Sequence, residues 1–291
     1  MRGMLGWMMS AVVLITRLVA EEVKFPDPVR VALWPQGAPD GSGGVNPEEK
    51  PAMTVYRPAQ PNGMAVVICP GGGYGGLVTG AEGQGIARWL YDSGITGVVL
   101  EYRLPGGRAM VPLIDVQRAI RLTRHHAAAW GLETNRVGVM GFSAGGHLAA
   151  TASTHFDAGS ATAKDVVSRQ GSRPDFAVLV YPVISMGPQG HGGSRQNLLG
   201  TNPPPARIRW FSCEEQVKTN TPPVFLAHAV DDRAVTIENS RLFAAALKAK
   251  GVPHRLLELP DGDHGLNGYK GASWDAWQRE SLAWMRALGT P

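Results

Sequence analysis

The sequence has little cysteine and little charge, and each shortage excludes a class of protein. Two cysteines, Cys69 and Cys213, are too few for a disulfide framework and lack the spacing of a zinc site, so we expect them to remain unpaired. Charged residues make up 18% of the chain, with 28 Lys and Arg against 24 Asp and Glu. The basic residues are scattered, which excludes a dedicated nucleic-acid-binding protein. The hydrophobic content of 44% excludes a largely disordered chain.

Long apolar runs are also lacking, except close to the N-terminus. Arg2 precedes an apolar stretch at residues 4–15, and Leu18-Val19-Ala20 follows before the first acidic residues. The stretch is too short for a membrane span, which needs about 20 residues. A basic residue, a short apolar stretch and a small residue are typical of a secretory signal peptide. We therefore expect a signal peptide at 1–20, no membrane span in the mature protein, and a secreted or periplasmic location, with a cytoplasmic location as the alternative.

Short β-rich runs alternate with helical stretches from residue 24 onward. This alternation is typical of a mostly parallel, twisted sheet flanked by helices, and residues 21–291 fit a single domain of this α/β class. Apolar residues at spacings of three and four predict helices over 116–130, 242–247 and 277–288, and in the last of these Trp277, Ser281, Trp284 and Leu288 share one face that we expect to pack on the sheet. The expected strands are 29–34, 54–57, 64–69, 97–102, 136–140, 176–181, 224–229 and 255–259.

Residues 186–220 interrupt this alternation. Several Gly and Pro residues surround a short helical run at 207–211, which indicates a small, cap-like insertion over the end of the sheet where the active site would lie. Trp210, Phe211 and the earlier Tyr74 could wall a substrate site, although core packing explains them equally well. The stretch 41–50 has the composition of a solvated loop without an obvious chemical role.

The strongest chemical signal is Gly141-Phe142-Ser143-Ala144-Gly145, which lies between an expected strand and a helical run. A serine flanked by small residues at such a corner can occupy a strained turn that exposes its hydroxyl as a nucleophile. The competing interpretation is a glycine-rich connection in which Ser143 only caps the helix. The strand before the motif and the helix after it favour the nucleophile.

A nucleophilic serine needs a base, and the base needs a carboxylate to orient it. His264 lies between glycines after the last expected strand, and two carboxylates, Asp231 and Asp232, follow the strand before it. His264 is therefore the expected base, and the residues alone leave Asp231 and Asp232 as alternatives for the acid. We expect His147 and His228 to make structural hydrogen bonds.

A glycine-rich segment follows the expected strand 64–69 and reads Pro70-Gly-Gly-Gly-Tyr-Gly-Gly76; we call residues 70–76 the glycine loop. Glycines let backbone N–H groups approach an oxyanion closely, as hydrolysis through Ser143 requires. A phosphate-binding loop is disfavoured because the lysine and spacing of such a loop are missing, and neither Glu82 nor Glu101 stands where a dinucleotide site needs an acid.

Four segments together, 70–74, 141–147, 231–235 and 262–265, resemble the α/β-hydrolases. More narrowly, the chain resembles bacterial carboxylesterases related to acetylxylan and feruloyl-type esterases, whose triad is similar to that of prolyl oligopeptidase-type hydrolases. The resemblance implies that Asp232, three residues before Val235, is the acid. It also implies that the N–H groups of Gly72, Gly73 and Ala144 form the oxyanion hole, although Pro70 stands where lipase-like sequences have histidine.

The main hypothesis is a serine carboxylesterase that hydrolyses short-chain acyl esters, above all acetyl esters, on xylan or another carbohydrate. Such chemistry needs Ser143, His264 and Asp232, and no metal or organic cofactor. Its partners would be a small ester or an acylated carbohydrate, and no nucleic acid. One alternative is a prolyl oligopeptidase-type peptidase, which is disfavoured because only about 60 residues precede the hydrolase core and leave no room for a propeller. The other is a catalytically silent binding protein, which is disfavoured because no triad residue is missing.

Overall fold

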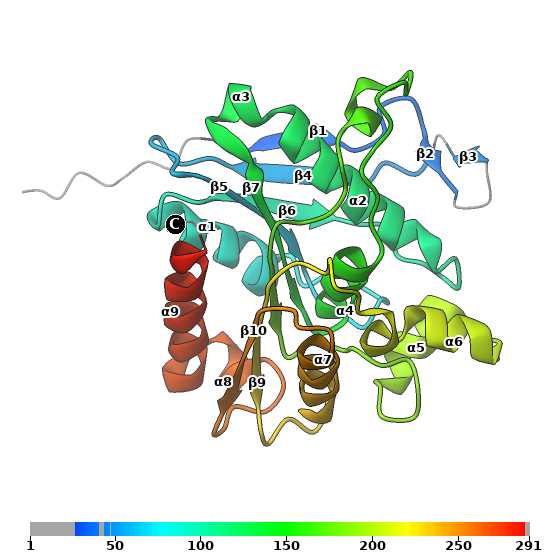
Figure 1. Cartoon of the computed structure of the whole chain (residues 1–291), viewed down its shortest axis with the longest axis vertical. Helices are drawn as coiled ribbons and strands as arrows, with labels where there is room; N and C mark the ends of the chain where they lie inside the picture. The colour runs from blue at the N-terminus through cyan, green and yellow to red at the C-terminus, as the bar shows by residue number, and fades with distance from the viewer. Residues whose placement is uncertain (1–26, 41–43, 47, 289–291) are drawn as a thin grey trace, which may run out of the picture.

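An eight-stranded sheet crosses the molecule, and helices cover both of its faces (Figure 1). The computed structural model describes residues 27–40, 44–46 and 48–288, so the expected signal peptide lies outside the described residues. The strand order is β1-β4-β6-β5-β7-β8-β9-β10; the pairs β1·β4 and β4·β6 are antiparallel, and all pairs from β6 to β10 are parallel. The strands are β1 (Val29–Ala32), β4 (Ala52–Tyr56), β5 (Gly63–Cys69), β6 (Thr96–Glu101), β7 (Leu132–Phe142), β8 (Ala177–Val180), β9 (Val224–Ala229) and β10 (His254–Leu259).

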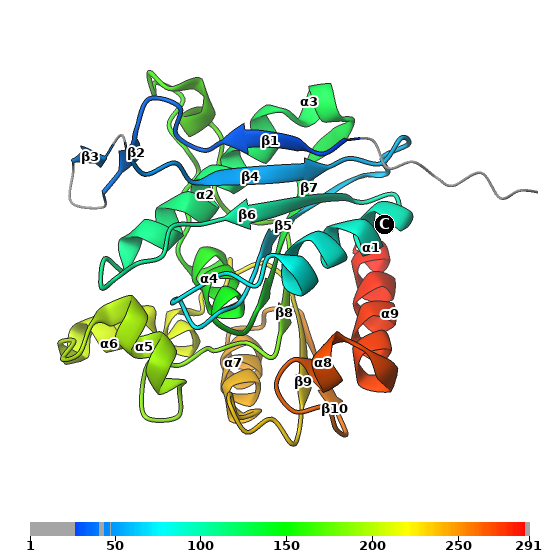
Figure 2. The same cartoon turned by 180° about the vertical axis from the view of Figure 1, so that it is seen from behind.

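Alternating side chains of the central strands enter two separate apolar layers, because successive residues of a strand point to opposite faces. Val67 and Val139 face the layer that includes residues of α2, α4 and α7, whereas Val66 and Met140 face the layer of α1 and α9. Figures 1 and 2 show these two helical layers from opposite sides. The helices are α1 (Gly85–Asp92), α2 (Met110–His125), α3 (Ala127–Trp130), α4 (Ser143–Thr154), α5 (Gly192–Leu199), α6 (Pro205–Phe211), α7 (Glu238–Ala249), α8 (Leu266–Tyr269) and α9 (Gly271–Ala287).

The helix expected over 116–130 is wrong as a single element. The backbone leaves the helical conformation at His126, so α2 and α3 are separate helices. Trp130 stacks on the His126 ring at a centroid distance of 4.8 Å. The prediction for α9 is confirmed for Trp277 and Ser281, which are fully buried, but wrong for Leu288, which follows the last turn and is 40% exposed.

The segment expected as a plain solvated loop at 41–50 contains structure. Val45–Asn46 forms strand β3, which pairs with β2 (Ala38–Pro39). Glu49 binds Arg103, whose guanidinium also forms a buried ion pair with Asp115 at 2.7 Å. A buried ion pair of this kind is costly to break on one side, because the remaining charge loses its partner. This segment is therefore tied to the core through Arg103.

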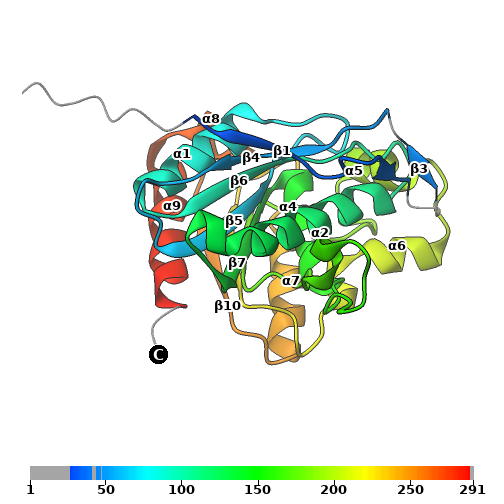
Figure 3. The same ribbon diagram turned by 90° about the horizontal axis from the view of Figure 1, so that it is seen from above.

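The insertion predicted at 186–220 contains α5, α6 and a short 3₁₀ turn at Cys213–Gln216. Helices α5 and α6 lie together beyond one end of the sheet (Figures 1 and 3). The side-chain amide of Asn197 on α5 donates a hydrogen bond to the carbonyl of Gly73 at 2.9 Å. The insertion thus contacts the glycine loop. Among the described residues, no helix is both long and apolar enough to cross a membrane.

Candidate active site

Ser143 lies at a sharp turn between β7 and α4. Its backbone has φ +53°, a conformation that residues with a side chain rarely adopt. The glycines of the motif allow the turn, because a Cβ on Gly141 would lie 2.1 Å from the Gly145 carbonyl oxygen and a Cβ on Gly145 would lie 2.1 Å from the Cys69 carbonyl oxygen. The residue in the capping position of α4 is Phe142, which excludes the interpretation of Ser143 as a simple cap. The turn presents the serine hydroxyl next to the end of β5.

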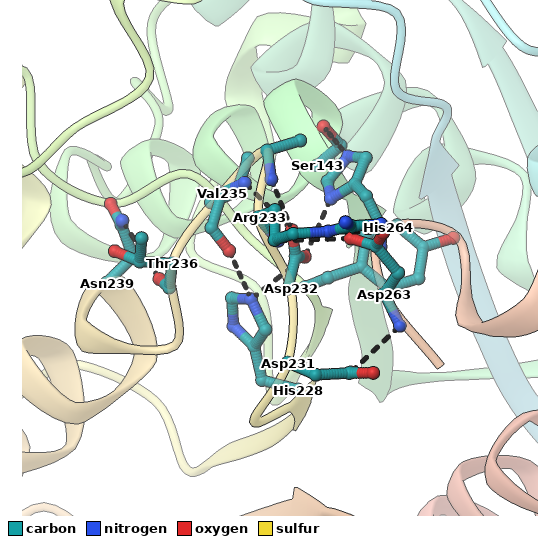
Figure 4. Close-up of polar contacts among 12 residues, drawn as sticks. Ser143, His228, Asp231, Asp232, Arg233, Val235, Thr236, Asn239, Asp263 and His264 are labelled. Carbon is teal, nitrogen blue, oxygen red and sulfur yellow. Dashed lines mark hydrogen bonds and ion pairs between the residues drawn. The ribbon is translucent and has the colours of Figure 1, made fainter. Parts of the chain in front are cut away.

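Three side chains from separate segments form a continuous hydrogen-bonded chain (Figure 4). The Oγ atom of Ser143 lies 2.9 Å from Nε2 of His264, and Nδ1 of His264 lies 2.8 Å from Oδ2 of Asp232. The serine follows β7, the carboxylate follows β9 and the histidine follows β10, so all three meet at the carboxyl end of the parallel strands. This is the geometry of a Ser-His-Asp triad.

The two carboxylates that the residues alone left open have different partners. Asp232 contacts His264, and its Oδ1 atom accepts the N–H groups of Ala234 and Val235 at 2.9 Å each. Asp231 instead accepts the N–H group of Asp263 at 2.9 Å and supports the loop before the histidine. The structure therefore places Asp232, and not Asp231, against the imidazole.

His228 supports Asp232 from below, as the expected structural hydrogen bond. Its Nε2 atom lies 2.8 Å from the Val235 carbonyl oxygen and 3.2 Å from Oδ2 of Asp232, and its Nδ1 atom lies 2.8 Å from the Ser240 hydroxyl. Two acceptors at Nε2 require a proton on that nitrogen. Burial alone would raise the pKa of Asp232, but the hydrogen bonds from His228, His264 and Val235 outweigh it and hold that pKa well below its usual range.

The glycine loop lies beside the serine. Gly72 and Gly73 have φ values of +126° and +63°, and a Cβ on Gly72 would lie 2.3 Å from the Gly76 carbonyl oxygen, so this position requires glycine. Within the described ranges, neither the Gly72 nor the Gly73 amide donates to a protein acceptor. Ala144 is the second residue of α4, where backbone N–H groups have no acceptor within the helix. These donors are available to a ligand.

His147 joins the glycine loop, α4 and the insertion, which confirms its structural role. Its Nδ1 atom lies 2.8 Å from the Tyr74 hydroxyl, and its Nε2 atom lies 2.7 Å from the Phe211 carbonyl oxygen. Tyr74 and Phe211 are buried and belong to the core, whereas Trp210 is partly buried and packs on the core with its ring 4.0 Å from that of His155. Burial lowers the pKa of His147 to about 4, so the ring is neutral at neutral pH.

Glu82 also lies in this region. The sequence suggests it only as a ligand of a dinucleotide, a role that its position disfavours. Its carboxylate is 3% exposed and accepts the N–H group of Gly71 at 2.6 Å, directly before the expected oxyanion glycines. The sequence feature that could have identified Glu82 is an acidic residue a few positions after a glycine-rich loop. Cys69 and Cys213 are both buried and free, as expected.

The fold and the site define an α/β-hydrolase. The chain matches the family model described as BD-FAE over residues 53–247, and it belongs to this family. It is 34% identical over 256 residues to an acetylxylan esterase of Xylanibacter ruminicola, and the match covers 85% of this chain and 50% of that protein. It is 36% identical over 216 residues to an endo-1,4-beta-xylanase B of Butyrivibrio fibrisolvens, covering 73% of this chain and 34% of that protein. The chain thus spans half or less of the length of these curated relatives.

Solved structures show the same fold. An acetyl ester-xyloside bifunctional hydrolase from Caldicellulosiruptor lactoaceticus superimposes with a TM-score of 0.85 and 38% identity, covering 91% of this chain and 98% of that one. The carboxylesterase Cest-2923 from Lactobacillus plantarum superimposes with a TM-score of 0.71 at 23% identity, covering 91% and 98% of the two chains. The α/β-hydrolase fold expected from the sequence is confirmed.

Proposed function

We propose that this protein is a serine carboxylesterase that hydrolyses short acyl esters, above all acetyl esters carried by xylan or its oligosaccharides. The observation that carries the proposal is the 2.9 Å contact between Ser143 Oγ and His264 Nε2, with His264 held in turn by Asp232 at 2.8 Å. A base in contact with the hydroxyl is what a serine nucleophile needs.

The reaction would proceed in two halves. In the first, His264 takes the hydroxyl proton while Ser143 Oγ attacks the ester carbonyl, and the imidazolium then gives that proton to the leaving alcohol as the acyl-enzyme forms. In the second, His264 takes a proton from water as the water oxygen attacks the acyl-enzyme, and the imidazolium returns that proton to Ser143 Oγ as the acyl–oxygen bond breaks and the carboxylic acid leaves. Asp232 fixes the ring orientation and stabilises the imidazolium in both halves.

The negative oxygen of each tetrahedral intermediate would bind to the N–H groups of Gly72, Gly73 and Ala144. Such donors act strongly because their positions are set before the charge develops. The N–H groups of Gly72 and Gly73 donate to no acceptor among the described residues, which supports this role, and the steric restriction at Gly72 shows that the loop conformation requires glycine there.

The xylan part of the proposal is supported by the relatives. One relative at 34% identity is named an acetylxylan esterase, and a solved structure at 38% identity is described as an acetyl ester-xyloside bifunctional hydrolase. A polymer of this kind lies outside the cell, so we also propose that residues 1–20 direct the protein to a secreted or periplasmic location. Sequencing the N-terminus of the protein recovered from culture supernatant and periplasm tests that location.

The experiment measures acetate release from acetylated xylo-oligosaccharides, with p-nitrophenyl acetate and butyrate in parallel. Ser143→Ala should lower every rate by at least about 10³-fold, because the nucleophile is lost. Ser160→Ala is the matched control, since Ser160 is exposed and its side chain contacts the Thr162 hydroxyl, away from the site. Turnover retained in Ser143→Ala overturns the nucleophile. Hydrolysis of the synthetic esters alone removes xylan as substrate, and cleavage of a prolyl peptide in preference to the esters supports the peptidase alternative.

A further inference from the structure

Glu82 is a buried carboxylate beside the candidate active site that the hydrolytic scheme leaves without a role. It lies in a π-helical turn at Gly80–Gln84 that connects the glycine loop to α1. Its side chain is 3% exposed, and no described Lys, Arg or His forms an ion pair with it. A buried carboxylate is costly unless hydrogen bonds compensate for the lost water. The partners of Glu82 must therefore supply that compensation.

Three donors converge on this carboxylate from three segments. The Gly71 N–H group donates to Oε2 at 2.6 Å, and the hydroxyls of Tyr181 and Tyr269 donate to Oε1 at 3.0 and 3.2 Å. Three donors can satisfy an ionised carboxylate, which can only accept. Burial raises the pKa of Glu82, and the hydrogen bonds from Gly71, Tyr181 and Tyr269 oppose that effect. Burial raises the pKa of Tyr181 well above its usual range and that of Tyr269 to about 12, and the charge of Glu82 adds to both effects, so both hydroxyls keep their protons as donors.

Both tyrosines adopt strained backbone conformations. Tyr181 has φ +38° directly after β8, and Tyr269 has φ +66° at the end of a left-handed turn that begins at Leu266. Left-handed backbone conformations are unfavourable for residues with a side chain. Strain of this kind persists where surrounding contacts enforce it, and it is concentrated at functional sites. In both cases the strained residue directs its hydroxyl at Glu82.

The donors also link Glu82 to the reacting groups. Gly71 is in close contact with the serine, because a Cβ on Gly71 would lie 2.6 Å from Glu82 Oε2 and 3.0 Å from Ser143 Cβ. The ring of Tyr181 packs edge-on against the ring of His264 with centroids 5.0 Å apart. One carboxylate therefore contacts both the start of the glycine loop and the residue against which the catalytic imidazole packs.

We propose that Glu82 is a positioning residue of the hydrolytic site: its carboxylate fixes the glycine loop through Gly71, holds Tyr181 against His264, and favours the charged imidazole that arises when Ser143 loses its proton. The inference rests on the proposed function, because it takes Ser143 as nucleophile and His264 as base. Glu82 contacts neither the substrate nor the transferred proton.

Several titratable groups besides Glu82 surround His264, and the test must separate their effects. Asp232 contacts Nδ1 of the ring, and Asp263 accepts the His264 backbone N–H. The pKa of His191, in the insertion, is lowered by burial and further by the charge of His264. Tyr181 and Tyr269 are neutral, and Arg233 is neutralised by Asp263. The groups that face His264 or Glu82 are Ser143, His191, Asp232, Asp263, Tyr181, Tyr269 and Tyr102.

Glu82→Gln isolates the charge. The amide oxygen of glutamine can accept from Gly71, and its NH₂ group can donate to the two tyrosine oxygens, whose hydroxyls rotate, so the contacts persist without the charge. We expect kcat for p-nitrophenyl acetate to fall by about 10-fold with KM within about twofold, because the imidazolium that arises in the transition state loses a nearby negative charge. The acid limb of the kcat/KM profile should move by about half a pH unit or more to lower pH, because the charged imidazole loses a nearby negative charge.

Tyr181→Phe isolates the tether, since it keeps the ring on His264 and removes the bond to Glu82. We expect it to lower kcat by about threefold or more, again without a large change in KM. Glu101→Gln is the matched control, because Glu101 is an exposed carboxylate on β6 that pairs with Arg30, and it should behave as the wild type. The melting temperature of each variant verifies folding. If Glu82→Gln does not fold, Tyr181→Phe decides: a lowered kcat supports the inference and an unchanged kcat overturns it.

The second readout is the rate at which a fluorophosphonate labels Ser143 as a function of pH. This rate reports the reactivity of the serine whatever the natural ester is, so failure of the xylan proposal does not affect it. The inference is overturned if Glu82→Gln labels and turns over like Glu101→Gln, or if kcat falls while the acid limb of both profiles stays in place. Failure of the proposed function itself would be seen as labelling and turnover that persist in Ser143→Ala.

Discussion

At the scale of single residues, the candidate active site depends on a backbone conformation that few serines adopt. Ser143 has φ +53° and a side chain that is only 8% exposed, yet its hydroxyl contacts the imidazole of His264. Such strain persists only where neighbouring contacts enforce it. The sequence predicts this residue well, because small residues on both sides of a serine between a strand and a helix are typical of such a turn.

The acid of the triad provides a residue-scale prediction. Asp232→Asn should lower kcat by about 10³-fold or more, because the amide no longer stabilises the imidazolium and disfavours the required tautomer. Asp231→Asn should remain within about tenfold of the wild type, since an amide oxygen can still accept the Asp263 N–H group. Steady-state hydrolysis of p-nitrophenyl acetate by the two variants measures the difference. Equal losses in both would remove Asp232 from its role.

The choice between these neighbours shows where residue-level reasoning ends. Asp231 and Asp232 have the same chemistry and lie one position apart, so the sequence pattern cannot separate them without a family resemblance. The structure separates them because the turn after β9 points one carboxylate at His264 and the other at the loop before it. The role of Glu82 was not predicted for a related reason: its partners Gly71, Tyr181 and Tyr269 are far apart in sequence and meet only through the fold.

At the scale of elements, the turn between β7 and α4 leaves no space for side chains at its glycines. A Cβ on Gly145 would lie 2.1 and 2.4 Å from the carbonyl oxygens of Cys69 and Pro70, and neither oxygen can move without displacing the end of β5. The strand, the turn and the start of the glycine loop therefore form one tightly packed unit.

The packing of this turn predicts that Gly145→Ala lowers the free energy of unfolding by about 3 kcal/mol or more, as overpacking against rigid backbone does. Gly192→Ala is the control: Gly192 begins α5, a Cβ there would meet no atom within 4 Å, and alanine favours helix. Urea denaturation of both variants tests this expectation. A Gly145→Ala variant as stable as Gly192→Ala would show that the turn can accommodate a side chain at this position, contrary to the structure.

The boundaries of elements were predicted less well than their existence. All eight strands of the large sheet overlap predicted runs. The parallel strands were found because such strands are short, apolar and bounded by glycine or polar residues. The break between α2 and α3 at His126 was not predicted, since the apolar spacing continues across it to Trp130. Periodicity detects a face of a helix and does not register a change in backbone direction.

At the scale of the whole molecule, the segments around the site are joined by buried polar groups. His147 connects the glycine loop, α4 and the insertion, and Glu82 connects the glycine loop to the segments that follow β8 and β10. The contacts through which the insertion supports the site join residues that are far apart in the sequence. The sequence therefore predicts the insertion and its helical run at 207–211 but not these contacts.

The buried His147 also makes stability depend on pH. Burial lowers the pKa of His147 to about 4, whereas an unfolded histidine titrates near 6.5. The unfolded chain therefore binds the proton first, so this contribution is fully present above about pH 6.5 and is lost as the pH falls towards 4. The expected loss is about 3 kcal/mol in the free energy of unfolding over that window.

Urea denaturation at intervals between pH 4 and 7 measures this dependence. His147→Gln should flatten the slope relative to the wild type, because glutamine can accept from Tyr74 and donate to the Phe211 carbonyl without titrating. An identical slope in both proteins would assign the pH dependence to other groups.

The whole molecule is proposed to be an esterase for acetylated xylan with Ser143 as its nucleophile, and competitive labelling of that serine tests both parts at once. The folded protein is labelled with a fluorophosphonate, with and without acetylated xylo-oligosaccharide, and the modified peptide is identified by mass spectrometry. We predict a single adduct at Ser143 that forms more slowly when the oligosaccharide is present, because substrate and label compete for the same hydroxyl. An adduct on another residue would show that Ser143 is not the nucleophile, and labelling of Ser143 that acetylated xylo-oligosaccharide does not slow at any concentration would show that xylan is not the substrate.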